Sequence, residues 1–372
     1  MSAMVFLWLA ISIAAILGCI LVLKLNPTIA LVIGSLIMGV GSGLGASATL
    51  SSITSGFGGT LGGIGLSVGF GVILGQLLSD SGGAKVIAHT LVRAASEKYA
   101  LYALGITAFL LSIPVFYDVT FVILIPLAIA VARQMNKPLP YTVGAMAIGA
   151  AAAHTLVPPT PNPLAAAEIF GFDLGVMVIV GLILGLTAAI LAMKIYFVLL
   201  DKGMWNKAKD ETGVEVYVET ETLEGKKTPS FGMSLIPIVL PVVLILMGTV
   251  VGAVTETVPT IISVLSNKTM AMLLGVLSAY IVASVCMNKK ERDDSATEAL
   301  KSSGIVLLIT GAGGSFGAVI SATGMADKLS GMIQGSSSSP LVAMLIAFLI
   351  AAVLRVALGS GTVASITAMN IV

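Results

Sequence analysis

Charged residues are scarce in this sequence of 372 residues. Asp, Glu, Lys and Arg make up 10% of the chain, hydrophobic residues make up 57%, and the mean hydropathy is +1.07. Because a soluble domain carries about 25% charged residues, this composition excludes a soluble globular protein and indicates a polytopic membrane protein. The net charge is +1, and basic residues do not cluster with interleaved aromatics, so we expect no nucleic-acid partner.

Cysteine and histidine are nearly absent. Cys19 and Cys286 lie far apart in apolar segments, without partners at metal-ligand spacing, so we expect neither a disulfide nor a thiolate metal site. His89 and His154 are the only histidines, which is too few for a histidine-rich metal site. Metal-dependent chemistry therefore finds no support in the sequence.

Long apolar runs predict an all-α polytopic fold with broken helices. The first run is too long for a signal-peptide core and lacks a basic flank, so we expect it to span the membrane. The predicted helices cover residues 4–23, 27–45, 99–113 continuing into 115–132, 141–153, 174–200, 233–253, 269–287 and 341–372.

A polar stretch divides the chain into two transmembrane parts. Residues 201–230 contain five lysines and seven acidic residues, and the later loop 288–301 is also basic. Two predicted helices separate these loops, so both must lie on one side of the membrane, and their lysines favour the cytoplasm. We therefore expect a first repeat over 1–200, a cytoplasmic connection over 201–232, and a second repeat over 233–372.

Two segments, 56–83 and 304–324, are too rich in glycine for ordinary spanning helices. The glycines resemble a dinucleotide fingerprint, but no βαβ context surrounds them. One alternative is close packing of helices in the bilayer. The other is a re-entrant or discontinuous segment whose backbone approaches a ligand. In that case the candidate binding residues are Gly58, Gly59, Thr60, Gly313, Gly314 and Ser315.

An internal repeat relates these two segments. A shift of 242 residues places six positions of the first, five of them glycines within 62–82, on identical residues of the second, and it places Asp118-Val-Thr120 on Ser360-Gly-Thr362. The uncharged loop 46–55 then pairs with the basic loop 288–297. Equivalent loops on opposite sides predict two inverted repeats, an architecture of many secondary transporters. In this register the second repeat is incomplete at its C-terminus.

Residues 112–126 predict a broken helix that carries an ionisable group. Asp118 lies inside an apolar run between Pro114 and Pro126. A charge in hydrocarbon is costly and usually faces a cavity or a partner, and backbone freed by proline is tolerated where it lines a cavity. The alternative is a kinked helix in which Asp118 caps a half-helix.

A second break is expected after His154, where four prolines follow within 158–163 and exclude a regular helix. Thr160 and Asn162 would supply polar groups there, although an ordinary extracellular turn is the alternative. Arg355 is a cation in an apolar run close to Ser360 and Thr362. Its guanidinium suits the capture of a carboxylate, or it extends to the membrane surface.

Five motifs in order along the chain resemble those of the gluconate permease family, a group of sugar-acid and hydroxy-acid proton symporters in the ion transporter superfamily. They lie at 56–65, 78–84, 116–122, 154–163 and 355–364. The resemblance implies uptake of gluconate, a related hydroxy acid or D-serine with protons, no cofactor, and a multi-pass location in the bacterial inner membrane. An acid stands at the Asp118 position in the family too. Thr120 and Asn162 replace glycines, and Thr160 replaces a histidine found in some members.

We therefore expect a secondary transporter that binds a small carboxylate and works by alternating access within the lipid bilayer. The expected substrate-binding residues are those named above together with Thr120, His154, Thr160, Asn162, Arg355, Ser360 and Thr362. Asp118 is expected to carry the coupling proton, with His154 as the second candidate. Alternatives are a sodium-coupled carrier, a passive channel, and a membrane-embedded hydrolase using His154 with Ser360. The oligomeric state is left open, with a homodimer as one option.

Overall fold

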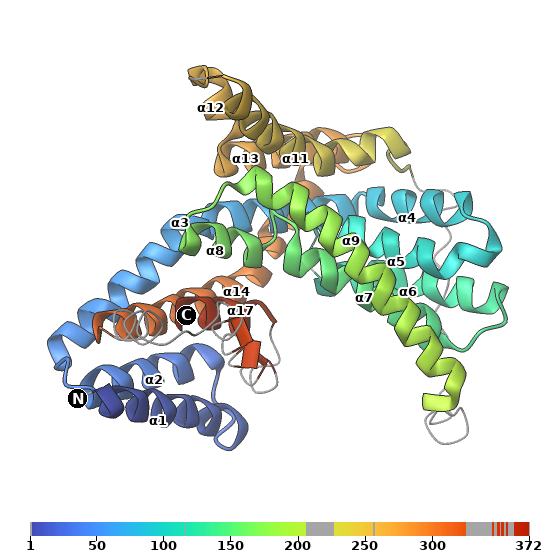
Figure 1. The fold of residues 1–372 in the computed structure, drawn as a ribbon. Helices are drawn as coiled ribbons and strands as arrows, with labels where there is room; N and C mark the ends of the chain where they lie inside the picture. Colours follow the sequence, from blue (N-terminus) through green and yellow to red (C-terminus); the bar gives the residue numbers. More distant parts are fainter. Residues whose placement is uncertain are drawn as a thin grey trace. The chain divides into compact units, whose positions relative to one another are not determined.

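The computed structural model describes residues 2–115, 117–205, 227–255, 257–324 and 361–371, with short pieces at 344–345, 348–349, 351–352 and 355 (Figure 1). Within these ranges every regular element is a helix. The chain divides into two compact units, each built from segments that are distant in sequence. Unit 1 comprises Met1–Leu66, Ala165–Gly171 and Ser302–Val372, and unit 2 comprises Ser67–Leu164 and Phe172–Lys301. Each unit therefore combines residues from both predicted repeats.

Unit 1 is built around a helical hairpin of two apolar helices. Helices α1 (Ser2–Leu21) and α2 (Pro27–Gly41) are joined by a short turn, in which the Asn26 side chain accepts a hydrogen bond from Thr28 N and Pro27 opens α2. Both features favour a helix start. The first part of α3 (Ala46–Asp80), the last part of α14 (Lys289–Ala322), and α17 (Gly361–Ile371) complete the unit. Its core includes Ile16, Leu31, Met38 and Phe316.

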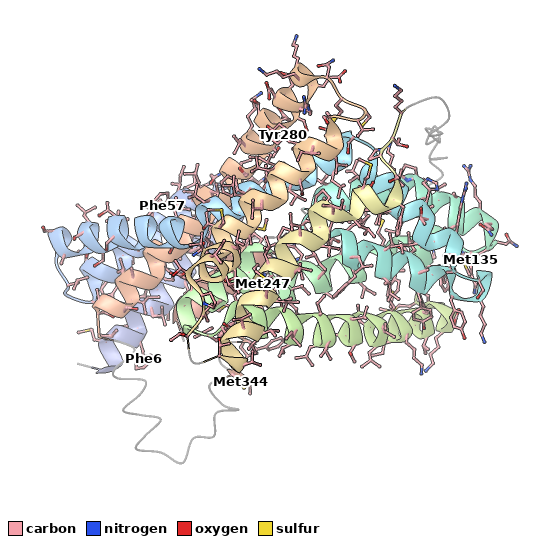
Figure 2. All side chains as sticks on the ribbon, turned by 90° about the horizontal axis from the view of Figure 1, so that it is seen from above. Phe6, Phe57, Met135, Met247, Tyr280 and Met344 are labelled. Atoms are coloured by element: carbon pink, nitrogen blue, oxygen red, sulfur yellow. The ribbon has the colours of Figure 1, made fainter. Side chains whose placement is uncertain are left out.

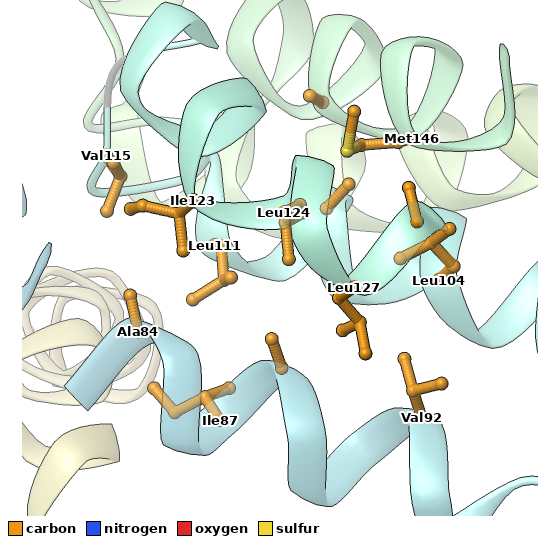
Figure 3. Close-up of a cluster of buried hydrophobic side chains, with 14 of the residues drawn as sticks. Ala84, Ile87, Val92, Leu104, Leu111, Val115, Ile123, Leu124, Leu127 and Met146 are labelled. Atoms are coloured by element: carbon orange, nitrogen blue, oxygen red, sulfur yellow. The ribbon is translucent and has the colours of Figure 1, made fainter. Parts of the chain in front are cut away.

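Unit 2 contains most of the helices. They are α4 (Gly83–Ala94), η1 (Glu97–Tyr99), α5 (Ala100–Leu111), α6 (Tyr117–Gln134), α7 (Leu139–Leu156), α9 (Leu174–Leu199), η2 (Leu200–Met204), α11 (Phe231–Val254), α12 (Thr260–Ser266) and α13 (Lys268–Ala283). Figure 3 shows one face of α4, with Ala84, Ile87 and Val92, packed against Leu104 of α5 and Leu127 of α6. Helix α8 (Pro161–Phe170) is divided between the two units.

Five described helices are long and apolar enough to cross a membrane: α1, α3, α9 continuing into η2, α11 and α14. The pair α12 and α13, bent by 68° at Asn267, would make a sixth. Figure 2 shows that outward side chains on these helices are mostly carbon, and Ile183 and Ile195 of α9 are each 61% exposed. Apolar side chains in this number on an outer surface fit contact with lipid, so the predicted all-α multi-pass class is confirmed.

The glycine-rich segments differ from the re-entrant hairpins that were one of the two expectations. Residues 46–80 and 289–322 each form one continuous helix. Each glycine costs a helix interior about 1 kcal/mol relative to alanine, but close helix packing offsets that cost. The first helix ends just before Gly82, whose φ of +77° is readily adopted by glycine.

Helices α4, α8 and α12 appear where none was expected. Helix α4 carries Lys85 and Arg93, which lowered its hydropathy below that of a spanning segment. Helix α8 begins at Pro161, inside the proline run that was expected to exclude a helix. Proline is tolerated in the first turn because the amide groups there have no partner within the helix.

Candidate functional site

The first break in unit 2 separates α5 from α6 at residues 112–116. Ser112 N and Val115 N still bond to carbonyls of the last turn of α5, Ala108 O at 3.0 Å and Leu111 O at 3.1 Å. The buried Ser112 hydroxyl donates to Thr120 Oγ1 at 3.5 Å. Thr120 therefore links the two sides of the break, and its hydroxyl acts there as a structural contact.

The second break separates α7 from α8 at residues 157–160. The Thr160 hydroxyl donates to Val157 O at 2.7 Å, and Leu164 N donates to Thr160 O at 3.2 Å. The first bond satisfies the Val157 carbonyl, whose helical partner would be the missing amide hydrogen of Pro161, and the second is the first regular bond of α8. Thr160 thus closes the end of α7 and opens α8.

A cavity lies between the two breaks. Its volume is about 10 Å³, so in this conformation it has room for about one water molecule. Its lining comes from α3, from the α5–α6 break, from α7 and from the α7–α8 break: Val68, Gly71, Ile113, Pro114, Val115, His154, Pro159, Thr160 and Pro161. His154 and Thr160, which were both predicted to bind substrate, therefore line the same cavity.

Close approach of α3 brings the first break to this cavity. A Cβ atom added to Gly75 would lie 2.9 Å from Val115 Cα and 3.1 Å from Pro114 O, distances that leave no room for a side chain. The glycines of α3 within unit 2 thus allow a helix to pack directly on broken backbone. This is the close-packing alternative of the sequence analysis.

Asn162 lies next to the cavity lining, in the first turn of α8. Its side chain is 5% exposed, and Oδ1 is buried without a hydrogen-bond partner among the described residues. A buried polar atom without a partner costs free energy, so its presence marks a position where a ligand group or an ordered water would bind.

Asp118 lies in the first turn of α6, directly after the first break. Its side chain is outside the described part of the structure, so its contacts stay a prediction. The position has electrostatic meaning, because the first turn of a helix carries unpaired amide groups and favours negative charge.

The predicted binding residues of the glycine-rich segments mainly form a helix contact in unit 1. A Cβ atom added to Gly56 would lie 2.6 Å from Gly314 O, and one added to Gly314 would collide with the Thr60 hydroxyl. Ser315 Oγ donates to Ile53 O at 2.8 Å. Gly313 is buried in α14, whereas no atom of another residue lies close to the Cβ positions of Gly58 and Gly59. Ligand binding by these six residues stays a prediction.

The C-terminal candidates are only partly described. Arg355 is exposed, and its guanidinium lies against Gly361 at the start of α17. Ser360 and the side chain of Thr362 fall outside the described residues. Capture of a carboxylate by Arg355 therefore stays a prediction.

Sequence reasoning missed Glu168 on α8. Its carboxyl carbon would lie 3.0 Å from a Cβ atom added to Gly63, within unit 1. The signal was available, because Glu168 is the one acid in the run 161–172. Among the described residues, no three His, Cys, Asp or Glu side chains gather as metal ligands.

Comparisons with known proteins identify the class of protein. A model of the GntP family permeases matches residues 4–372. An uncharacterised permease of Haemophilus influenzae is 36% identical, covering 98% of this chain and 76% of its own length. A high-affinity gluconate transporter of Escherichia coli is 35% identical (97% and 82%), and a gluconate permease of Pseudomonas aeruginosa is 33% identical (97% and 81%). These matches confirm the resemblance seen in the motifs. The protein is therefore a multi-pass transporter of the bacterial inner membrane and not an enzyme. The chain belongs to the GntP family permeases.

Proposed function

We propose that this protein takes up gluconate or a related small hydroxy acid together with protons, by alternating access. The observation that carries the proposal is the small cavity between two helix breaks, lined by His154 and Thr160. Two relatives of this chain are named for gluconate. Broken helices are also the usual place of the substrate site in secondary transporters.

The N-terminus of α6 is the proposed site for the substrate carboxylate. Its unpaired amide groups and the helix dipole favour an anion at the first break. Asp118 occupies the same turn, so a charged Asp118 would repel the substrate carboxylate. Binding of both is favourable when Asp118 is protonated, which couples proton and substrate.

The helix boundaries support the proposed inverted repeat. Shifted by 242 residues, α2 falls on 269–283, and α13 runs over Lys268–Ala283. Helix α3 falls on 288–322, and α14 runs over Lys289–Ala322. Gly82 falls on Gly324, and both have positive φ, +77° and +67°. The paired segments 46–55 and 288–297, expected as loops, form the first turns of α3 and α14. The contrast between an uncharged and a basic segment at these equivalent helix ends remains the basis for proposing inversion.

Reconstituted vesicles test the coupling ion. Purified full chain in proteoliposomes should accumulate labelled D-gluconate when the outside is acidic, and an uncoupler should abolish the accumulation. Removal of sodium should have no effect. Uptake that survives the uncoupler and requires sodium would replace this proposal with the sodium-coupled carrier. Chemical analysis of the internal label distinguishes transport from hydrolysis, since a transporter delivers gluconate unchanged.

The variant Asp118→Asn tests the proton carrier. The amide mimics the protonated acid, so exchange of labelled for unlabelled gluconate should persist while accumulation driven by the pH gradient disappears. Asp118→Glu, which keeps a titratable group, should retain some accumulation. If Asp118→Asn still concentrates gluconate, Asp118 is structural and His154 becomes the candidate.

A further inference from the structure

The start of α8 is unusually poor in hydrogen-bond donors. A helix N-terminus normally presents four free amide groups, which is why anions bind there. Here Pro161 and Pro163 have no amide hydrogen, and Leu164 N is already bonded to Thr160 O at 3.2 Å. Asn162 N is left as the one free donor among these four positions. This helix end is therefore a poor site for a carboxylate.

The side chains at the same place offer acceptors instead. Thr160 is buried, lines the cavity, and gives its hydroxyl hydrogen to Val157 O, so its remaining lone pairs can only accept. Asn162 Oδ1 is a second acceptor, buried and without a partner among the described residues. A site with two hydrogen-bond acceptors and few donors is complementary to a ligand group that donates a hydrogen bond, such as a hydroxyl.

We propose that the α7–α8 break is the end of the site that recognises substrate hydroxyl groups, with Asn162 as the specificity-determining acceptor. This inference rests on the proposed function and assigns the residue that contacts the hydroxyl end of its substrate. The substrate then lies with its carboxylate at the α6 end of the cavity and a hydroxyl donating to Asn162. Asn162 directly follows Pro161, which lines the cavity between the two breaks.

A functional-group cycle tests the contact. Binding of D-gluconate and of its singly deoxygenated analogues would be measured by calorimetry on the purified full chain. In the native protein one analogue should bind about tenfold more weakly, the loss expected for one hydrogen bond. In Asn162→Leu, gluconate should weaken by about the same factor, and that analogue should show no further loss.

Two further variants separate this role from structural effects. Asn162→Asp keeps an acceptor and adds a negative charge, so it should weaken gluconate through repulsion of the carboxylate and still retain the hydroxyl preference. If the substrate carboxylate were bound here, the added charge would abolish binding. Thr107→Val is the matched control, since Thr107 Oγ1 is also buried without a partner among the described residues but lies in the interior of α5 and not at a helix break. It should leave affinity unchanged.

Three results would overturn the inference. The native protein could bind every deoxygenated analogue as tightly as gluconate, as expected if water satisfies Asn162. Asn162→Leu could weaken gluconate and all analogues equally, which is the signature of a structural residue. Should Asn162→Leu fail to fold, loss of the hydroxyl preference in Asn162→Asp refutes the inference by itself. If the native chain bound no acid at all, the proposed function itself would be refuted. This result differs from the three above, in which the native chain binds gluconate.

Discussion

Helices α5 and α7 of unit 2 meet at two glycines. A Cβ atom added to Gly149 would collide with the carbonyl oxygen of Gly105 and lie 2.8 Å from its carbonyl carbon. Backbone cannot rotate away as a side chain can, so the helices must separate. We expect Gly149→Ala to lower the free energy of unfolding by about 1–3 kcal/mol, the usual cost of overpacking. Thermal unfolding in detergent measures this effect.

Gly232→Ala is the matched control for this substitution. Gly232 lies in α11 and has open space around its Cβ position, so the same change should be neutral or slightly stabilising. Equal stability of Gly149→Ala and the native protein would show that α5 and α7 adjust without cost.

Helices α9 and α11 are connected by a single carboxylate. Asp173 caps α9 by accepting from Val176 N at 2.8 Å, and it also accepts from Thr249 Oγ1 of α11 at 2.7 Å. Asp173→Ala removes both bonds and should cost about 1–2 kcal/mol, whereas Thr249→Val removes one and should cost about 1 kcal/mol. The double variant should then be no less stable than Asp173→Ala.

Thr187→Val supplies the control, because the Thr187 hydroxyl bonds to Ile183 O within its own helix. Strictly additive losses in the double variant would show that the bond between α9 and α11 contributes nothing to stability.

Most helices, and both helix breaks, could be predicted from the sequence. Apolar runs and prolines act locally, and α5, α6, α7 and α9 match the predicted ranges within a few residues. The sequence analysis did not predict α8, because proline is tolerated in the first turn of a helix and the start of this helix was not known. Glycine-rich α3 was ambiguous for a different reason. Its stability comes from neighbours such as Val115, which are distant in sequence.

For the site, two residues of the motif that ends at 163, His154 and Thr160, line one cavity, and their role in binding stays a prediction. The sequence alone could not show which polar groups at the α7–α8 break are free to donate a hydrogen bond to a ligand and which can only accept one. That distinction depends on which groups are already bonded, as the Thr160 hydroxyl is to Val157 O.

The topology of the whole molecule can be tested at Cys286, in the turn between α13 and α14. Basic residues that follow the turn predict a cytoplasmic location. Burial, with a smaller effect of Glu291, raises the pKa of the Cys286 thiol. In a Cys19→Ser background, a membrane-impermeant maleimide should label inside-out vesicles and not right-side-out vesicles. Because the thiolate reacts, labelling should be slow at neutral pH and accelerate as the pH rises through the raised pKa.

Labelling of right-side-out vesicles would place this turn outside and reverse the proposed orientation. A rate that does not change between neutral and alkaline pH would show that the thiol is already ionised at neutral pH, the opposite of a raised pKa.

The proline-rich break has a spectroscopic consequence. Amide hydrogens report on backbone in nuclear magnetic resonance and hydrogen exchange, and four of the six residues 158–163 have none. Of the other two, Thr160 N is bonded to Val157 O at 3.3 Å, while the amide of Asn162 has no bond within the described residues. Asparagine-selective ¹⁵N labelling would therefore turn this nearly silent segment into one with a single resonance, placed beside the cavity where a bound solute would shift it.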